Sequence, residues 1–555
     1  MELGRLGALM ESKPGLVWIG GDADTGCREF EPSLSAAFGV RRICKSEKSA
    51  LGESLRVSLN AVVISEGAGV ASLLRDWFSA RRNCPSALFG IVLRNRSARE
   101  PGTWRRIGLR MVLAVTDFMI VEKGVASAFV KAERFPARRI FDLAVKGEAL
   151  AEFLRGRLGA EANSILWVDP NIHKNSPAMK NLVDTAPLVV REGWELRVWC
   201  KQTEISDDIA EITLLRVPSR IAVLMIFAFI FRANVHRLWI RILKGRPPAR
   251  LVHSCGSYYL GAEMVSVHFG NRLWLKKQVE LGFERVRDFF EFGFTALATI
   301  TDALQYRHFG CKVFLPVSDS LANEVRGSCR PEAEVVVVPS AYDAAHFNLQ
   351  VRDAWRVPVR RQLGIADDER LLAFVSQGSY RRKGLWLALD ALTLVRARDP
   401  RLRFRFMIIG GKPDRVEALR TEIAGRYRDW NDWIFFTGFV PDLAHYLAAS
   451  DGFLFPSYFE SFAAVEVEAA AMGVPLLLTQ HFGNEMVLRH GSNGLLLPWR
   501  ADAIALDLER FLSEGIPNFR ASVEKGISRA EFHKRILSLY RAFFASEKPT
   551  LARQS

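Results

Sequence analysis

Short apolar runs alternate with longer helical patterns along almost all of this 555-residue sequence, and this alternation most constrains its fold. Examples are residues 61–64 (AVVI), 165–168 (ILWV) and 371–375 (LLAFV), each bounded by polar residues. Runs of this length are typical of strands buried on both faces of a parallel sheet. The helical patterns between them supply the crossover connections that parallel strands need. The sequence therefore predicts an α/β fold built from doubly wound parallel sheets.

The pattern falls into three blocks and a terminal helix. We predict an N-terminal α/β domain over residues 1–160, a second domain over 161–352 and a third over 353–525. Residues 348–359 read as a linker into the third domain. Residues 526–555 carry apolar side chains at helical spacing and are expected to form a helix that packs back, followed by a tail.

Charge and cysteine content narrow the class of protein. A net charge of +15 and a pI of about 9.6 suit nucleic acid, an acidic membrane surface or phosphorylated small molecules. The chain contains no zinc-finger spacing or RNP-type aromatic run, which disfavours nucleic acid. Seven widely spaced cysteines and no apparent secretory signal favour the reducing cytoplasm.

The most apolar stretch, residues 221–231 (IAVLMIFAFIF), is short for a membrane span. One interpretation is a buried core helix. The other is a helix lying at a membrane interface, because several basic residues follow it, and a basic amphipathic helix suits an anionic bilayer.

The strongest candidate site follows the apolar run at residues 452–455. Open α/β sheets bind ligands at the carboxyl ends of their strands. Glu460 stands in the turn after this run, and Glu468 lies eight residues further on in an Ala-rich helix. The backbone N–H groups of Ser461, Phe462 and Ala463 are expected to point out of the helix start and form an anion site.

A second candidate element follows the run at 371–375. Residues 376–384 (SQGSYRRKG) combine a flexible loop at Gly378 with the cations Arg382 and Lys383. Arginine contacts phosphate through two N–H groups and lysine through a point charge, so this loop suits a diphosphate. Fixed cations would also stabilise the charge that develops on a leaving diphosphate.

These residues resemble the C-terminal, donor-binding domain of GT-B glycosyltransferases, specifically family 4, the large retaining group. Glu460 and Glu468 have the family's spacing, and residues 470–475 (AAMGVP) are close to the run that follows it. The resemblance implies that Glu468 binds the ribose, Glu460 faces the donor sugar, and Arg382 and Lys383 hold the diphosphate. The family usually has glycines where this chain has Ser461 and Ala463, which narrows the space above the backbone.

Weaker matches complete the resemblance, which covers about residues 164–546. Gly438 and Phe439 stand where the family's backbone contacts the nucleotide base. His268 resembles the family's histidine near the reaction centre. Asn175 and Ser176 stand in the first loop of the second domain, where many members have paired glycines, and are expected on the acceptor side.

The resemblance implies a GT-B enzyme with two facing Rossmann-like domains, here with an additional N-terminal Rossmann-like α/β domain. Its reaction would move a sugar from a UDP-, GDP- or ADP-sugar to a glycan or lipid-linked acceptor, with retention, in cell-envelope polysaccharide biosynthesis. No cofactor or metal is expected, and the Asp22-Ala23-Asp24 pair is interpreted as a plain loop. We expect a cytoplasmic enzyme, with peripheral binding to the inner face of the cell membrane as a further expectation, and no nucleic-acid partner.

Two alternatives stay open. One is another GT-B enzyme, a sugar synthase or a nucleotide-sugar epimerase. The other is a non-catalytic binding protein derived from a GT-B scaffold. For residues 1–160 the expectation is a regulatory, scaffolding or acceptor-handling role.

Overall fold

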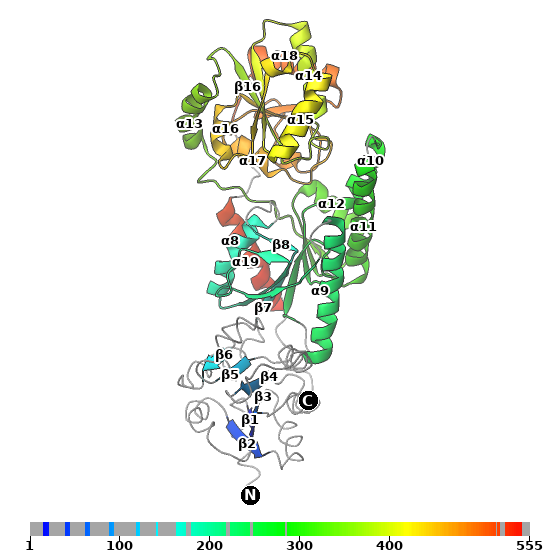
Figure 1. Cartoon of the computed structure of the whole chain (residues 1–555), viewed down its shortest axis with the longest axis vertical. Helices are drawn as coiled ribbons and strands as arrows, with labels where there is room; N and C mark the ends of the chain where they lie inside the picture. Colours follow the sequence, from blue (N-terminus) through cyan, green and yellow to red (C-terminus); the bar gives the residue numbers. More distant parts are fainter. Residues whose placement is uncertain are drawn as a thin grey trace. The chain divides into compact units, whose positions relative to one another are not determined.

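A computed structural model describes six strands within residues 15–142 and, beyond them, residues 163–173, 179–217, 222–244, 248–283, 286–517, 519–521 and 528–546 (Figure 1). The chain divides into two compact units. One comprises Met1–Asn171 and Ala186–Val252, and the other Ile172–Thr185 and His253–Ser555. Three large parallel sheets account for nearly all the described strands, as the alternating pattern predicts.

The first sheet is formed by the N-terminal apolar runs. Its strands are β1 (Gly15–Gly20), β2 (Gly39–Cys44), β3 (Ala61–Glu66), β4 (Leu88–Leu93), β5 (Phe118–Val121) and β6 (Ile140–Asp142). All its pairs are parallel, in the order β2-β1-β3-β4-β5-β6. This is the other common doubly wound order rather than the dinucleotide-binding one. Asp22 and Asp24 lie outside the described residues.

The second sheet has the order β11-β9-β7-β12-β13-β14-β15. Its strands are β7 (Ser164–Val168), β9 (Glu195–Cys200), β11 (Glu211–Leu214), β12 (Leu251–Cys255), β13 (Met264–Val267), β14 (Val313–Pro316) and β15 (Glu334–Val335), and β8 (Asn171–Ile172) pairs separately with β10 (Gln202–Thr203). The intervening helices are α8 (Lys180–Arg191), α9 (Ala222–Lys244), α10 (Asn271–Leu281), α11 (Val286–His308) and α12 (Asp319–Ser328). β7, β12 and β13 are buried along their whole length, as expected for strands covered on both faces.

Helix α9 contains most of the apolar stretch at 221–231, and it is not buried on all sides. Leu224, Phe231, Leu238 and Trp239 are exposed, with 73% of Phe231 accessible to solvent. The core-helix interpretation is therefore wrong for the described part of α9. Among the described helices, none combines the length and apolar character that crossing a membrane requires.

The third sheet has the order β18-β17-β16-β19-β20-β21, with every pair parallel. Its strands are β16 (Arg370–Val375), β17 (Phe404–Ile409), β18 (Ile434–Gly438), β19 (Gly452–Phe455), β20 (Leu476–Thr479) and β21 (Gly494–Leu497). The associated helices are α13 (Leu349–Gln362), α14 (Leu385–Arg398), α15 (Pro413–Arg426), α16 (Leu443–Ala449), α17 (Ala464–Ala471) and α18 (Ala501–Glu514), with short 3₁₀ turns η3 (Trp430–Asp432) and η4 (Asn484–Met486), and α19 (Arg529–Ser546) follows.

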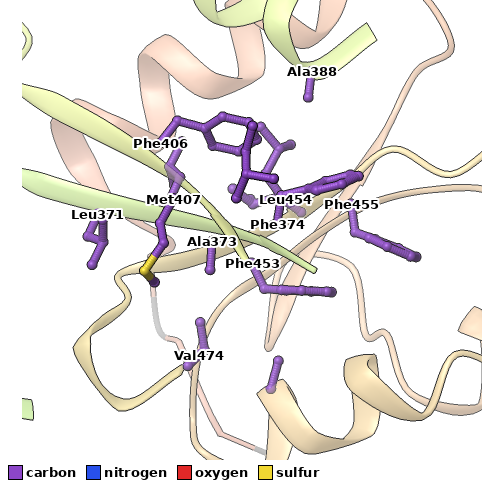
Figure 2. Close-up of a cluster of buried hydrophobic side chains, with 14 of the residues drawn as sticks. Leu371, Ala373, Phe374, Ala388, Phe406, Met407, Phe453, Leu454, Phe455 and Val474 are labelled. Atoms are coloured by element: carbon purple, nitrogen blue, oxygen red, sulfur yellow. The ribbon is translucent and has the colours of Figure 1, made fainter. Parts of the chain in front are cut away.

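This order is the one typical of dinucleotide-binding folds, and it reverses between β16 and β19. The strands bury an aromatic core in which Phe374, Phe406, Phe453 and Phe455 lie close together (Figure 2). Helices α14 and α18 pack together, as do α13 and α16. A rigid core of this kind fixes the ends of β16 and β19, where the candidate site lies.

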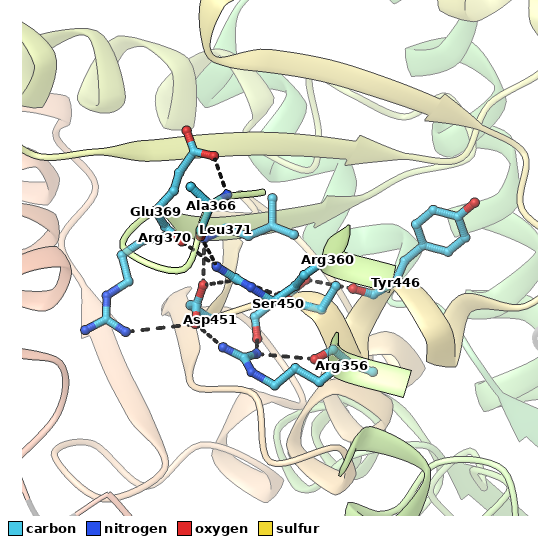
Figure 3. A network of polar contacts seen from close by, with 11 residues as sticks. Arg356, Arg360, Ala366, Glu369, Arg370, Leu371, Tyr446, Ser450 and Asp451 are labelled. Carbon is cyan, nitrogen blue, oxygen red and sulfur yellow. Dashed lines mark hydrogen bonds and ion pairs between the residues drawn. The ribbon is translucent and has the colours of Figure 1, made fainter. Parts of the chain in front are cut away.

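The segment that reads as a linker in the sequence is instead helix α13. Asn348 caps it, because its side-chain oxygen accepts a hydrogen bond from the Val351 N–H at 2.9 Å. Its inward face carries Arg356 and Arg360, which both bind the carboxylate of Asp451 (Figure 3). Arginines on the packed face conceal the apolar periodicity by which a helix is recognised.

Candidate functional site

The loops that follow β16 and β19 meet at the point where the strand order reverses. Gly384 has φ of +73°, and a Cβ there would lie 1.8 Å from the carbonyl oxygen of Pro456. Only glycine allows this approach. The contact is reinforced by the carbonyl of Arg382, which accepts hydrogen bonds from the Tyr458 N–H at 2.9 Å and the Ser457 hydroxyl at 3.2 Å. The two sequence motifs are therefore neighbours in space.

Their charged side chains form one buried cluster. Glu460 Oε1 lies 3.2 Å from Arg382 Nη1 and 3.7 Å from Lys383 Nζ, and Glu460 is only 8% exposed. Burial lowers the pKa of Lys383. Burial by itself would raise the pKa of Glu460, but the charges of Lys383, Arg382 and His481 outweigh it and hold this pKa below its usual value. The carboxylate is thus kept ionised beside two cations.

The turn after Glu460 differs in detail from the expectation. Helix α17 begins at Ala464 with Ala463 as its N-cap, so Ser461 and Phe462 precede the helix. Ser461 is buried, and its hydroxyl oxygen accepts a hydrogen bond from the Gly270 N–H at 3.1 Å. A Cβ at Gly483 would lie 2.8 Å from the Cα of Phe462. The backbone of this turn is consequently enclosed by two neighbouring loops.

Glu468 lies within α17, half-buried. Burial raises its pKa, and the charges of Lys180 and His346 act in the opposite direction.

On the same helix, Glu466 is 1% exposed and its Oε1 lies 2.6 Å from Nε2 of His481, which is also buried. The sequence reasoning missed this pair. A signal existed, since His481 comes two residues after β20, at the edge of the sheet where the site forms.

The remaining donor-side residues lie at the same edge. Gly378, with φ of +128°, lies in the loop after β16. Gly438 is the last residue of β18. The carbonyl of Gly438 accepts a hydrogen bond from the Gly410 N–H at 2.8 Å. Phe439, the residue after β18, is 68% exposed.

His268 follows β13 directly. Burial lowers its pKa to about 4, so the imidazole is neutral at physiological pH. The next residue, Phe269, packs edge-on against Phe459 with ring centroids 5.1 Å apart, and the Arg382 guanidinium lies 5.7 Å from its ring centre. The loop that carries His268 thereby adjoins the turn that carries Glu460.

A buried polar chain lies behind His268. His253 Nε2 is 2.8 Å from the Ser266 hydroxyl, and His253 Nδ1 is 2.6 Å from the hydroxyl of Tyr540, which is completely buried in α19. Burial, followed by the charge of His268, lowers the pKa of His253 to about 3. The terminal helix predicted from the sequence is thus anchored on β12 and β13, next to His268.

Asn175 and Ser176 lie outside the described residues. Asp169, directly after β7, is buried, and burial raises its pKa to about 8. It accepts a hydrogen bond from the Asn171 N–H at 2.7 Å. No group of three or more potential metal ligands occurs in the described part of the chain.

Comparisons with known proteins find similarity mainly around the third sheet. The family model described as "Glycosyl transferases group 1" matches residues 369–514, the segment that contains the third sheet. An uncharacterized glycosyltransferase of Methanocaldococcus jannaschii is 28% identical over 210 residues, which cover 37% of this chain and 51% of that protein. The amylovoran biosynthesis glycosyltransferase AmsK of Erwinia amylovora is 29% identical over 213 residues, 37% of this chain and 48% of its own length.

Among solved structures, a sucrose-phosphate synthase of Thermosynechococcus elongatus aligns with a TM-score of 0.52 and 18% identity, over 69% of this chain and all of that one. This likeness concerns the fold. The fold is therefore of the GT-B type, and residues 369–514 are similar to group 1 glycosyl transferases. The chain matches about half of the length of each of these two curated relatives.

Proposed function

We propose that this protein transfers a sugar from a nucleotide-sugar to a glycan or lipid-linked acceptor, with retention at the anomeric carbon and without a metal. The observation that carries the proposal is the buried contact of Glu460 with Arg382 and Lys383 at the reversal point of the third sheet. Two cations and a carboxylate at that position suit a diphosphate joined to a sugar.

The side chains divide the donor between them. Arg382 and Lys383 bind the diphosphate and stabilise its growing negative charge as it leaves. Glu468 accepts hydrogen bonds from the ribose, and Gly438 and Phe439 adjoin the base. Glu460 and His268 face the sugar. A neutral imidazole, as the lowered pKa of His268 dictates, can exchange a hydrogen bond with a sugar hydroxyl at physiological pH.

In the reaction, an oxygen of the acceptor bonds to the anomeric carbon while the bond from that carbon to the diphosphate oxygen breaks. The proton of the acceptor hydroxyl passes to the leaving phosphate, on the same face of the sugar. No protein nucleophile is needed for this step.

For the acceptor, we infer a glycan or lipid-linked intermediate of cell-envelope polysaccharide synthesis, handled at the cytoplasmic face of the membrane. Helix α9 supports this inference, because it contains basic residues but neither Asp nor Glu and exposes Phe231 and Trp239. Apolar and basic groups on one helix favour an anionic bilayer surface. The name of the Erwinia relative points to the same kind of pathway.

The test begins with a thermal-shift screen of the full chain against UDP-, GDP- and ADP-sugars, since a ligand that binds only the native state raises Tm. Binding to a hit is then compared by calorimetry for wild type, Glu468→Ala and Glu417→Ala. Glu417 is an exposed glutamate of α15 and serves as the matched control. We expect only Glu468→Ala to weaken binding.

Product analysis with and without acceptor completes the test. Transfer of sugar to an added glycan or lipid-linked acceptor supports the proposal. A product formed without that acceptor would indicate a synthase or an epimerase. Absence of any shift across the whole screen would contradict a nucleotide-sugar donor.

A further inference from the structure

A buried acid–base pair lies beside the donor site, formed by two residues that the sequence motifs do not include. Glu466 Oε1 and His481 Nε2 are 2.6 Å apart, and the two residues are 1% and 5% exposed. The second carboxylate oxygen of Glu466 makes no hydrogen bond with the described residues. Water cannot solvate a net charge at this depth. The pair therefore has its lowest free energy when the two groups share one proton and carry no net charge.

The pair joins the two segments that enclose the Glu460 turn. Glu466 belongs to α17, which follows the turn, and His481 belongs to the loop after β20. The same loop contacts the turn through Gly483, where a Cβ would lie 2.9 Å from the carbonyl oxygen of Ser461. The short hydrogen bond therefore clamps that loop to α17, with the turn between them.

The pair also contributes to the charge of the site. The charged groups whose fields reach it are Glu460, from the turn, and Lys383, from the loop after β16. With one proton the pair is neutral, and Arg382, Lys383 and Glu460 together leave one net positive charge. Loss of that proton cancels this positive charge.

We propose that Glu466 and His481 are positioning residues that hold the Glu460 turn and, through their shared proton, keep the donor site cationic. This inference rests on the proposed nucleotide-sugar donor. It makes donor affinity depend on a proton that is not transferred in the reaction.

The direction of the pH effect follows from the surroundings. Burial alone would lower the pKa of His481, but the charge and hydrogen bond of Glu466, with the charge of Glu460, outweigh it and raise this pKa. Burial raises the pKa of Glu466, against the charge of His481. Both shifts favour retention of the proton, so it is lost only as pH rises through the raised pKa of His481.

The experiment measures affinity for the best nucleotide-sugar of the screen from about pH 6 to about pH 9, a range that spans the ordinary histidine pKa. The pyrophosphate diester of the probe has no proton to lose in this range. For wild type we expect affinity to fall about tenfold towards the alkaline end, the effect of one unit charge at several ångströms in a partly buried site.

Two substitutions separate charge from position. In Glu466→Gln the amide oxygen can still accept the histidine N–H, but no ionised form remains, so affinity should stay level across the range. Glu466→Ala removes the clamp as well, and we expect its KM for the donor to be about tenfold higher than that of Glu466→Gln. Asp451→Asn, at the opposite edge of the sheet, should keep the wild-type pH profile.

A pH profile of Glu466→Gln that parallels wild type would overturn the proposal. A histidine-selective NMR titration of the ligand-free protein gives a second readout, in which the pKa of His481 should fall in Glu466→Gln. If it does not, the charge coupling is absent. If wild type binds no nucleotide-sugar while the NMR shift occurs, the proposed donor fails although the proton-sharing pair exists.

Discussion

Glu460 Oε1 lies 3.2 Å from Nη1 of Arg382, in a turn from which solvent is almost excluded. The cation that is expected to bind the donor diphosphate is therefore already neutralised in part by the carboxylate expected to face the donor sugar. A bound diphosphate would have to share or displace this contact.

Substitution of Glu460 by glutamine tests that competition. The amide keeps the shape but removes the negative charge, so KM for the donor should stay the same or fall. The carboxylate's interaction with the reacting sugar is lost, and kcat should drop by about a hundredfold. Steady-state kinetics with varied donor measure both values. A raised KM with unchanged kcat would show that Glu460 binds the donor without acting on its reaction.

The tight approach of the two loops predicts a second outcome. Gly384 and Gly491 both have φ of +73°, but a Cβ would meet the Pro456 carbonyl at 1.8 Å in the first case and no atom within 4 Å in the second. Both alanine variants incur the same backbone strain of about 1 kcal/mol. Gly384→Ala should lose at least about 2 kcal/mol more of unfolding free energy, as expected when a buried contact is overpacked.

Urea denaturation of the two glycine variants measures this difference. The nucleotide-sugar affinity of Gly384→Ala should also fall, because Lys383 is the adjacent residue, whereas Gly491→Ala keeps it. Equal stability losses in the two variants would mean that the loops can move apart without cost.

Much of this arrangement could be predicted from the sequence, because it depends on local patterns. The apolar run before Pro456 and the spacing of Glu460 and Glu468 identify a strand, a turn and a helix without any knowledge of packing. The loops of Arg382 and Glu460 both follow strands of one parallel sheet. The sequence therefore predicts that these two residues lie near each other at the carboxyl edge of that sheet.

What the sequence did not reveal depends on long-range packing. The position of His481 just after β20 indicates its edge of the sheet, but its pairing with Glu466 depends on how α17 and the loop after β20 pack together. Helix α13 resembles a linker in the sequence because Arg356 and Arg360 occupy the face that packs against Asp451. An arginine is expected on the surface unless it has a charged partner, and the partner of both is Asp451, about ninety residues later in the sequence.

The Asp451 cluster predicts a loss of stability without loss of function. The Asp451 carboxylate binds Arg360 at 2.8 Å and the Leu371 N–H at 2.8 Å (Figure 3). Asp451 comes just before β19, whereas the candidate donor site lies after it, at the other end of the strand. Asp451→Asn leaves the buried Arg360 and the half-buried Arg356 without their counter-charge, and the free energy of unfolding should fall by about 3 kcal/mol.

Chemical denaturation checks the Asp451 prediction, and calorimetry with the donor supplies its control. Donor affinity per folded molecule should match wild type. A loss of affinity larger than about threefold would indicate that this cluster reaches the donor site through the sheet.

The anchor of the terminal helix gives a further prediction. Tyr540→Phe keeps the packed ring of α19 but removes the hydroxyl 2.6 Å from His253 Nδ1, leaving a buried ring nitrogen without its partner. The expected cost is about 1–3 kcal/mol of unfolding free energy. Denaturation of wild type, Tyr540→Phe, His253→Gln and the double variant forms a double-mutant cycle that measures how much of the cost belongs to this contact. If Tyr540→Phe is as stable as wild type, the hydroxyl does not anchor α19.

His253, which contacts Tyr540, and the nearby His268 should both stay neutral at mildly acidic pH. Burial lowers the pKa of His268 to about 4, and burial together with the charge of His268 lowers that of His253 to about 3, from an ordinary value of 6.5. The unfolded chain takes up these two protons near pH 6.5, but the native state does not. Their contribution to stability is therefore complete above that pH and is lost as the pH falls.

As pH falls from about 6.5 to about 4, each imidazole that stays neutral in the native state should lower the free energy of unfolding by about 1.4 kcal/mol per pH unit. Histidine-selective NMR measures the two native pKa values directly, and at pH 5 both rings should still give neutral-form signals. Substitution of His268 by glutamine should reduce the pH slope of unfolding by one proton and raise the pKa of His253, because a neighbouring charge is removed. A native pKa above 6 for either ring would show that water reaches the base of the His268 loop, and would weaken its assignment as a neutral hydrogen-bonding group facing the donor sugar.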